Sequence, residues 1–247
     1  MDRLYAQEYR ELYERHWWWR AREDLILALL EEHVGARRPV SILDVGCGDG
    51  LFFEKLERFG PVEGIEMDPS GLDAKGRWAA RIRVGPFDRS FQPGRRYGVI
   101  LMLDVLEHLP DPSAALARAM DLLEPDGTLL ITVPAFRMLW TSHDVLNRHH
   151  TRYTRGQVRR LVEVAGGRVI ESRYFFLFTT PVKLAVRMRE MALGGEPTVP
   201  VVPPGWANRA LYRVSRIEQR VFSRVPAPFG TSLYAVVTPS SSSTVRS

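Results

Sequence analysis

An apolar run that ends in three alternating glycines constrains the fold of this chain more than any other feature. Residues 42–45 are apolar apart from Asp44, and Gly46, Gly48 and Gly50 follow directly. Glycines let the backbone turn tightly and approach a ligand closely, because no Cβ stands in the way. A helical pattern begins after the turn, and the first N–H groups of a helix are free to bind polar ligand groups. The pattern predicts a buried strand, a ligand-binding turn and a helix.

A second predicted strand, residues 62–66, ends in an acidic side chain. Glu66 lies 20 positions after Gly46. In dinucleotide-binding folds, a carboxylate at the tip of the second strand accepts hydrogen bonds from ribose hydroxyls. A solvated acid at a strand end is the alternative, but the spacing agrees with the glycine turn. Glu66 is therefore predicted to bind a ribose.

Short β-branched runs alternate with helical patterns from residue 40 onward. Strands are predicted at residues 40–45, 62–66, 81–84, 98–103, 128–133, 169–176 and 232–238. Helices are predicted between them at residues 50–59, 70–79, 113–123 and 155–165. Strands separated by crossing helices form βαβ units. The chain is therefore predicted to be an α/β protein with a mostly parallel, doubly wound sheet.

Two segments fall outside this alternation. Residues 1–33 predict one or two helices that carry Trp17, Trp18 and Trp19 in a row, and residues 181–225 predict further helices around a proline-rich hinge. Successive helical residues point about 100° apart, so three tryptophans cannot all face one core. At least one of them is expected to face a ligand cleft or a partner. The alternative is that two tryptophans lie in the core and one lies on the surface. The low-complexity residues 239–247 are expected to be disordered.

Composition excludes several classes of protein. The 247 residues are 45% hydrophobic and 26% charged, as in ordinary globular chains, and no run approaches the roughly 18 apolar residues of a membrane helix. The single cysteine, Cys47, cannot form an internal disulfide. The charged N-terminal segment lacks the apolar stretch of a signal peptide. We expect a cytoplasmic protein with no transmembrane segment.

The net charge of +5 is concentrated in one segment, because residues 181–225 hold eight Lys or Arg and three Glu. Aliphatic residues recur there at helical spacing with arginines between them, at Leu211, Val214, Ile217 and Val221. This pattern predicts an amphipathic helix. Packing of the apolar face on the core is the preferred interpretation, while contact with a second subunit or with an anionic membrane surface stays open. The protein is expected to be a monomer or a homodimer.

The glycine spacing separates two classes of cofactor. A dinucleotide fingerprint places its third glycine three residues after the second, whereas Gly46, Gly48 and Gly50 alternate. With Asp44 before them, these glycines resemble motif I of the class I S-adenosylmethionine-dependent methyltransferases of the bacterial small-molecule type. The resemblance continues through Glu66 and through residues 97–109 and 122–134, and it covers about residues 40–176.

The resemblance implies a particular architecture. It predicts a Rossmann-like sheet of seven strands that is mostly parallel, with the last strand antiparallel. Residues 1–238 would form a single domain, in which residues 1–38 serve as a helical lid and residues 181–225 form a helical insertion before the last strand.

The resemblance also implies a cofactor site for S-adenosylmethionine, whose product is S-adenosylhomocysteine. The methionine part would be surrounded by the first turn, at Asp44, Gly46, Cys47 and Gly48. Later strand ends would hold the rest, with Glu66 at the ribose, Met67 and Asp88 at the adenine, and Leu103 with Asp104 beside the sulfonium. The family commonly has acids where this chain has Pro86 and Gly98.

The loop after the fifth predicted strand, residues 134–154, is dense in groups that move protons. It contains three of the six histidines of the chain. His143 is the first candidate for a general base and His149 the second, with Asp144 orienting one of them. His108, which follows Glu107 after the fourth predicted strand, is interpreted as structural, with catalysis as the alternative.

The same loop is expected to form a wall of the acceptor site. Predicted substrate contacts come from this loop and from the N-terminal helices: Trp140, Arg152, Tyr153, Tyr9 and Trp18. No metal site is predicted, because the carboxylate and the histidines lack a repeated ligand spacing and the loop has no cysteine.

The motifs together imply a methyltransferase that modifies a small-molecule acceptor on oxygen or nitrogen. The positive net charge suggests a nucleic-acid methyltransferase as an alternative. It is disfavoured, because residues 104–107 lack the Asn/Asp-Pro-Pro-Tyr type of motif and no RNA-binding module is recognisable. A protein that binds the cofactor without catalysis is the second alternative, and methyl transfer to any acceptor would distinguish the two.

Overall fold

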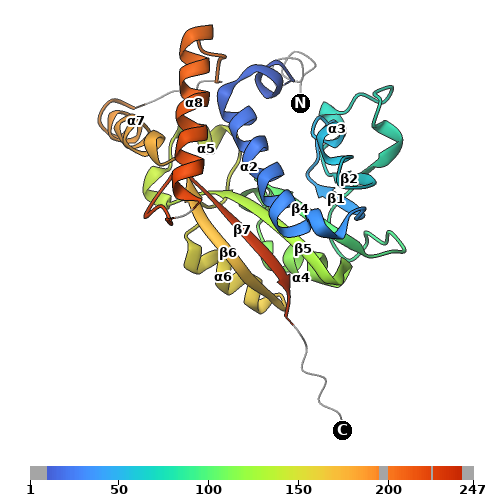
Figure 1. The fold of residues 1–247 in the computed structure, drawn as a ribbon. Helices are drawn as coiled ribbons and strands as arrows, with labels where there is room; N and C mark the ends of the chain where they lie inside the picture. Colours follow the sequence, from blue (N-terminus) through green and yellow to red (C-terminus); the bar gives the residue numbers. More distant parts are fainter. Residues whose placement is uncertain (1–9, 195–199, 224, 241–247) are drawn as a thin grey trace.

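Seven strands form one central sheet in the computed structural model, which describes residues 10–194, 200–223 and 225–240 (Figure 1). They are β1 (Ile42–Val45), β2 (Val62–Glu66), β3 (Ile82–Val84), β4 (Tyr97–Leu103), β5 (Leu123–Pro134), β6 (Gly167–Phe175) and β7 (Ser232–Pro239). Their order across the sheet is β3-β2-β1-β4-β5-β7-β6. In this order, the neighbouring strands β3, β2, β1, β4 and β5 pair in parallel, and β7 runs antiparallel to β5 and β6. The predicted fold class is confirmed.

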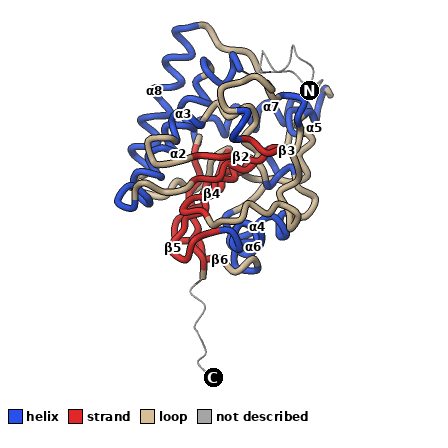
Figure 2. Tube along the Cα trace, turned by 90° about the vertical axis from the view of Figure 1, so that its right-hand side faces the viewer, coloured by secondary structure: helices blue, strands red, loops and turns tan. Residues whose placement is uncertain are grey.

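Helices cover both faces of this sheet. They are α2 (Trp17–Val34), α3 (Phe53–Leu56), α4 (Pro112–Leu122), α5 (Ser142–Leu146), α6 (Arg155–Val164), α7 (Thr180–Leu193) and α8 (Gly205–Phe222). Short 3₁₀ helices are η1 (Gly35–Arg37), η2 (Pro69–Gly71), η3 (Ala79–Arg81), η4 (Leu106–His108), η5 (Arg137–Leu139) and η6 (Leu177–Thr179). In Figure 2, α4 and α6 lie on one side of the sheet, while α2, α3 and α8 lie on the other. Each side encloses its own apolar core.

Helix α2 is a packed layer of the fold. It begins after His16, whose imidazole accepts a hydrogen bond from the backbone N–H of Trp18 at 3.1 Å. Ala21, Ile26 and Leu30 are buried against the sheet. Trp17 joins this core, and Trp18 and Trp19 are half-buried. The lid motion expected for residues 1–38 stays a prediction, and Tyr9 lies outside the described residues.

The prediction of a helix at residues 70–79 is wrong. That segment contains only η2 and the start of η3. The carboxylate of Asp68 accepts from the N–H of Ser70, and that of Asp73 accepts from the N–H of Lys75. Such side-chain bonds offer the backbone an alternative to a helix, and the low helix propensity of Gly71 adds to the effect. The helix expected at 50–59 is likewise reduced to α3 with flanking turns.

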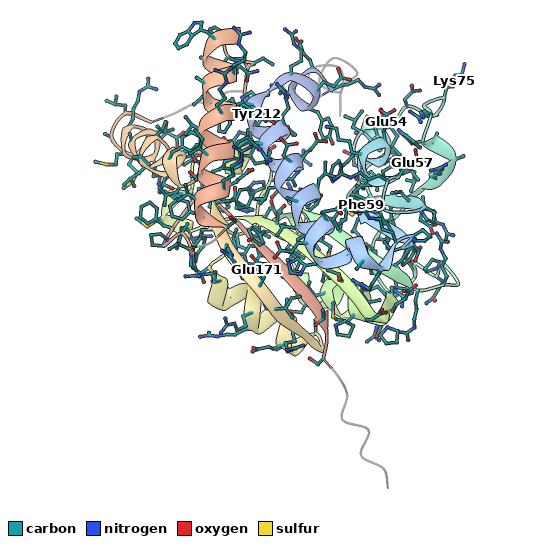
Figure 3. All side chains as sticks on the ribbon, viewed as in Figure 1. Glu54, Glu57, Phe59, Lys75, Glu171 and Tyr212 are labelled. Atoms are coloured by element: carbon teal, nitrogen blue, oxygen red, sulfur yellow. The ribbon has the colours of Figure 1, made fainter. Side chains whose placement is uncertain are left out.

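The insertion forms α7 and α8, and α8 lies beside α2 (Figure 1). Its polar side makes the contact: Tyr212, labelled in Figure 3 on the side of α8 that faces α2, donates to Asp24, and Gln219 donates to the carbonyl of Ala21. Leu211 packs on the core. The rest of the predicted apolar face is exposed, which corrects the expectation that it packs inward. We call this set the exposed row of α8: Val214, Ile217 and Val221.

Candidate active site

The glycine turn after β1 opens toward solvent. Gly46, Gly48 and Gly50 have φ angles of +71°, +54° and +71°, in the left-handed region that favours glycine. A Cβ built on Gly48 would meet no atom of residues 10–194, 200–223 or 225–240 within 4 Å, whereas one on Gly46 would lie 2.9 Å from Cγ2 of Val105. The space beside the Cα of Gly48 is therefore open to a ligand, as the sequence pattern requires.

Glu66 ends β2 directly beside this turn. Its Oε2 accepts from the N–H of Gly48 at 2.9 Å, and its Oε1 accepts from the N–H of Asp68 at 2.9 Å. A carboxylate offers about four acceptor positions, so about two remain for other donors. The two backbone bonds hold the carboxylate in place, and its remaining capacity suits a pair of hydroxyl groups.

Two carboxylates lie at the carboxyl ends of the central strands. Asp44 in β1 is buried, and burial raises its pKa to about 7, although the positive charge of Arg22 opposes this shift. Asp104, just after Leu103 at the end of β4, has a φ of +56°. Its Oδ2 lies 2.7 Å from Nη2 of Arg22, and its Oδ1 accepts from the hydroxyl of Thr132 at 3.1 Å. The ion pair between Arg22 and Asp104 therefore joins helix α2 to the carboxyl end of β4.

The remaining predicted cofactor residues surround the same edge. Met67 follows Glu66 and is 63% exposed, so its side chain is available to cover a ligand. Asp88, in the loop after β3, is exposed and accepts from the backbone and hydroxyl of Ser90. Cys47 is half-buried, and burial raises the pKa of its thiol, which keeps the sulfur protonated.

Asp144 is the centre of the loop after β5. It is fully buried, and both of its oxygens face donors. Oδ1 accepts from Nε of Arg152 at 2.8 Å and contacts Nδ1 of His149 at 2.9 Å. Oδ2 accepts from Nη2 of Arg152 and from the N–H of Thr141, both at 2.9 Å. Burial alone would raise the pKa of Asp144, but these bonds and the charge of Arg152 hold it well below its ordinary range.

This arrangement determines which histidine Asp144 orients. Because the carboxylate is ionised and can only accept, Nδ1 of His149 carries a proton, and in the neutral ring Nε2 is the acceptor. The ring of His149 lies 4.7 Å from the ring of His108, edge to face. His143 lies elsewhere, with Nε2 3.0 Å from the amide of Asn147, and burial lowers its pKa to about 4. Of the two predicted bases, His149 is the one that Asp144 holds.

Glu107 is a site residue that sequence reasoning did not select. It is 1% exposed, and its Oε2 has no hydrogen-bond partner among the described residues. Burial raises the pKa of Glu107 well above its ordinary range, and the negative charge of Asp104 adds to this effect. The Glu107-His108 pair was visible in the sequence, but its proximity to His149 depends on two separate loops.

The predicted substrate residues divide into two groups. Arg152 and Tyr153 are buried, and Tyr153 donates to the carbonyl of Leu106 at 3.0 Å. Their polar atoms serve the framework that joins the loops after β4 and β5, so we do not include them in the acceptor site. Trp140 is half-buried beneath the guanidinium of Arg137. Trp18 lies 5.4 Å from the guanidinium carbon of Arg22, close to Asp104.

Comparison with known proteins assigns the family. Residues 10–172 match the model of the family described as "Methyltransferase domain", and the chain belongs to this family. It is 34% identical over 102 residues to a ubiquinone biosynthesis O-methyltransferase of Azorhizobium caulinodans, which covers 38% of this chain and 40% of that protein. It is 27% identical over 194 residues to a protein of the same name from Xanthomonas euvesicatoria pv. vesicatoria, covering 72% and 71%. The chain spans less than half the length of the first of these relatives.

The solved structures that resemble most of this chain include two SAM-dependent methyltransferases. A TehB-like SAM-dependent methyltransferase from Corynebacterium glutamicum has a TM-score of 0.54 at 20% identity and covers 95% of this chain and 96% of its own. A SAM-dependent methyltransferase from Archaeoglobus fulgidus has a TM-score of 0.54 at 15% identity and covers 88% and 94%. At 20% and 15% sequence identity, these similarities show the fold alone.

Proposed function

We propose that this protein is an S-adenosylmethionine-dependent methyltransferase that acts on a small-molecule acceptor. The observation that carries this proposal is the open backbone at Gly48 beside Glu66, whose carboxylate is held in place with acceptor capacity to spare. When bound, the cofactor supplies a methyl group activated by a positive sulfonium. The product is S-adenosylhomocysteine.

Different residues along the sheet edge bind different parts of the cofactor. Asp44, Gly46, Cys47 and Gly48 hold the methionine part, and Glu66 accepts from the ribose hydroxyls. Met67 and Asp88 border the adenine, and Leu103 with Asp104 borders the reactive methyl. The main task of the chain is to hold an acceptor in line and to exclude water, because such positioning contributes several kcal/mol to lowering a barrier.

We place the acceptor between the loops that follow β4 and β5. His149 is the acceptor-side group in this proposal, because Asp144 fixes its ring through Nδ1, which makes Nε2 the acceptor of the neutral imidazole. Oxygen is the favoured acceptor atom, which agrees with the names of the curated relatives. Trp140 and Trp18 supply apolar surface at the edges of this region.

The insertion is part of the acceptor side. Glu190 on α7 accepts from the N–H and the hydroxyl of Ser142, at 3.0 and 2.7 Å, and so ties the insertion to the loop of His149. The exposed row of α8 lies among arginines, which suits peripheral contact with an anionic membrane surface from the cytoplasm. Among the described helices, none is both long and apolar enough to cross a bilayer.

Calorimetry and methyl-transfer assays test the proposal. We expect micromolar affinity for S-adenosylmethionine, roughly −7 to −8 kcal/mol. Glu66→Ala should cost about 1.5–3 kcal/mol of that affinity, because it removes charge-assisted hydrogen bonds. Gly48→Val should weaken binding through the positive φ and the blocked approach. Unchanged affinity in both variants would exclude the cofactor site.

The acceptor side is tested by a pair of histidine variants. His149→Asn should lower kcat by about 10²–10⁴ with cofactor affinity nearly intact. His143→Asn is the matched control, because that ring bonds to Asn147 and not to Asp144. Equal losses of kcat in the two variants would refute the assignment of His149. Radiolabelled methyl transfer to a panel of phenols, alcohols and amines would identify the acceptor atom, and its failure with every acceptor would favour a non-catalytic binding protein.

A further inference from the structure

Three side chains with metal-ligating atoms converge in front of β4 and β5. Glu107 and His108 belong to η4, after β4, and His149 comes from the loop after β5. One ligand atom from each lies within 4.8 Å of the other two. Metal–ligand bonds of about 2.0–2.2 Å place two ligands of one ion about 3–4 Å apart, so small side-chain shifts suffice to close the site.

The unpartnered oxygen of Glu107 is independent support for a ligand. This carboxylate is 1% exposed, and within the part of the chain that the structure describes its Oε2 has no hydrogen-bond partner. A buried carboxylate without a partner is costly, and a cation bound to it would remove that cost. The nearby guanidinium of Arg22 is already paired with Asp104, and that of Arg152 with Asp144. Neither is free to take the place of a bound ion.

The hydrogen bonds around His149 prepare its free nitrogen for a metal. Asp144 fixes the Nδ1–H tautomer, so the lone pair of Nε2 is presented on the other side of the ring. Histidine ligands of metals are oriented in this way by a carboxylate on the second ring nitrogen. The backbone N–H of His150 donates to the carbonyl of Glu107 at 2.6 Å, which holds the two loops together.

A second group of similar composition shows what a satisfied cluster looks like. Glu32, His33 and Glu171 also place one ligand atom each within 4.8 Å. However, Glu171 accepts from the hydroxyl of Tyr234, contacts His33 at 3.0 Å and pairs with Arg173. Its ligand capacity is used by the protein, so we assign no ion there.

We propose that Glu107, His108 and His149 bind one divalent transition-metal ion, of the zinc or manganese class, at the acceptor side of the site. Two imidazoles and one carboxylate are a ligand set that such ions accept, with positions left open for a substrate oxygen. The role in catalysis rests on the proposed function; the binding of the ion does not. This proposal replaces the prediction, made from residue spacing alone, that the chain has no metal site.

The ion would assist transfer to a hydroxyl group. An acceptor hydroxyl on the metal has a lowered pKa and loses its proton to solvent water. The oxygen lone pair then forms the bond to the methyl carbon, and the carbon–sulfur bond breaks with its electron pair left on sulfur. The products are the methyl ether, neutral S-adenosylhomocysteine and one proton. His149 acts in this scheme as a ligand, so no free imidazole is needed as base.

Zinc binding by the tag-free, chelator-treated protein tests the site without any acceptor. We expect calorimetric titration with zinc chloride, checked by metal analysis, to give one zinc ion per chain. Glu107→Gln, His108→Asn and His149→Asn should each weaken binding by more than about tenfold. His150→Asn is the matched control, because this exposed histidine is adjacent to His149 and outside the cluster. His108→Asn is the decisive variant, since His108 is exposed and its replacement leaves the buried framework intact.

The outcomes separate the two proposals. No stoichiometric zinc in the wild type, or equal weakening in His150→Asn and His108→Asn, would overturn the site. Zinc binding that fails in His108→Asn but persists in His150→Asn supports it. Calorimetry with S-adenosylmethionine is run on the same samples. Cofactor binding without zinc binding would refute the metal site alone, and zinc binding without cofactor binding would refute the methyltransferase assignment alone.

Discussion

Replacing Asp144 by asparagine tests how the loop after β5 is held together. Both carboxylate oxygens face donors, so an asparagine amide finds no suitable orientation. With its NH₂ group at the Oδ2 position, it would face Nη2 of Arg152 and the N–H of Thr141. With the amide flipped, it would face Nε of Arg152 and Nδ1 of His149. Either way at least two hydrogen bonds are lost and a buried guanidinium loses its counter-charge.

The expected cost follows from these contacts. Hydrogen bonds to charged groups contribute about 1.5–3 kcal/mol each, so two of them give about 3–6 kcal/mol. Breaking a buried ion pair from one side costs about 3–5 kcal/mol, which agrees. The Asp144 side chain is 0% and the Arg152 side chain 3% exposed, so solvent cannot compensate. We therefore expect Asp144→Asn to lower the free energy of unfolding by about 3–5 kcal/mol near neutral pH.

Urea unfolding followed by circular dichroism measures this loss. Asp126→Asn is the control, because Asp126 is 72% exposed and lies 3.7 Å from Arg37, where at most about 1 kcal/mol is expected. If Asp144→Asn does not fold, the double variant with Arg152→Gln should recover part of the stability, since the orphaned cation is gone. A loss below about 1 kcal/mol, or one equal to that of the control, would refute the reasoning.

Three further predictions concern pH, packing and the surface. Asp44 has a pKa of about 7 in the fold but an ordinary one when unfolded, so between these values only the folded state keeps its proton. Rising pH should therefore reduce the unfolding free energy across that window by roughly 4 kcal/mol, and urea titrations of Asp44→Asn should lack this fall. Gly230→Ala should destabilise by about 1–3 kcal/mol in the same assay, because its Cβ would lie 2.3 Å from a backbone carbonyl oxygen of β6. Gly156→Ala should not, because its Cβ would meet no described atom within 4 Å. Anionic vesicles should float the protein at low salt, with loss at high salt and in an Arg213→Gln/Arg220→Gln variant; no flotation at low salt would leave a second copy of the chain, detectable by sedimentation, as the partner of the exposed row of α8.

The sheet and one edge of the site were accessible to sequence reasoning because they depend on local patterns. The glycine turn and Glu66 end adjacent parallel strands, so their proximity follows from the strand order. The helix expected at residues 70–79 failed because the side-chain bonds of Asp68 and Asp73 compete with helical bonds. The spacing of hydrophobic residues alone does not reveal this competition between side-chain and helical hydrogen bonds.

The other misjudged features depend on tertiary contacts. The apolar spacing in α8 predicted a buried row, yet the helix packs through Tyr212, Gln219 and Glu218, whose carboxylate accepts from the backbone N–H groups of residues 177 and 178. Likewise, the cluster around Glu107 joins two loops about 40 residues apart, and no ligand spacing within one segment reveals it. Ranking His143 with His149 also required knowing which ring Asp144 contacts.

The bond between Glu190 and Ser142 has a consequence for protein engineering. The insertion is contiguous in sequence, and this carboxylate joins α7 to the start of α5 next to the packing of α7 on η5 and η6, on the side of the sheet edge away from Glu66. A segment exchanged between related chains would therefore need a matching acceptor at position 190 and a matching donor at position 142, in addition to the contacts that α8 makes with α2 and η6. Under the proposed function, such an exchange would change acceptor preference and leave the half of the sheet around β1 and β2 untouched.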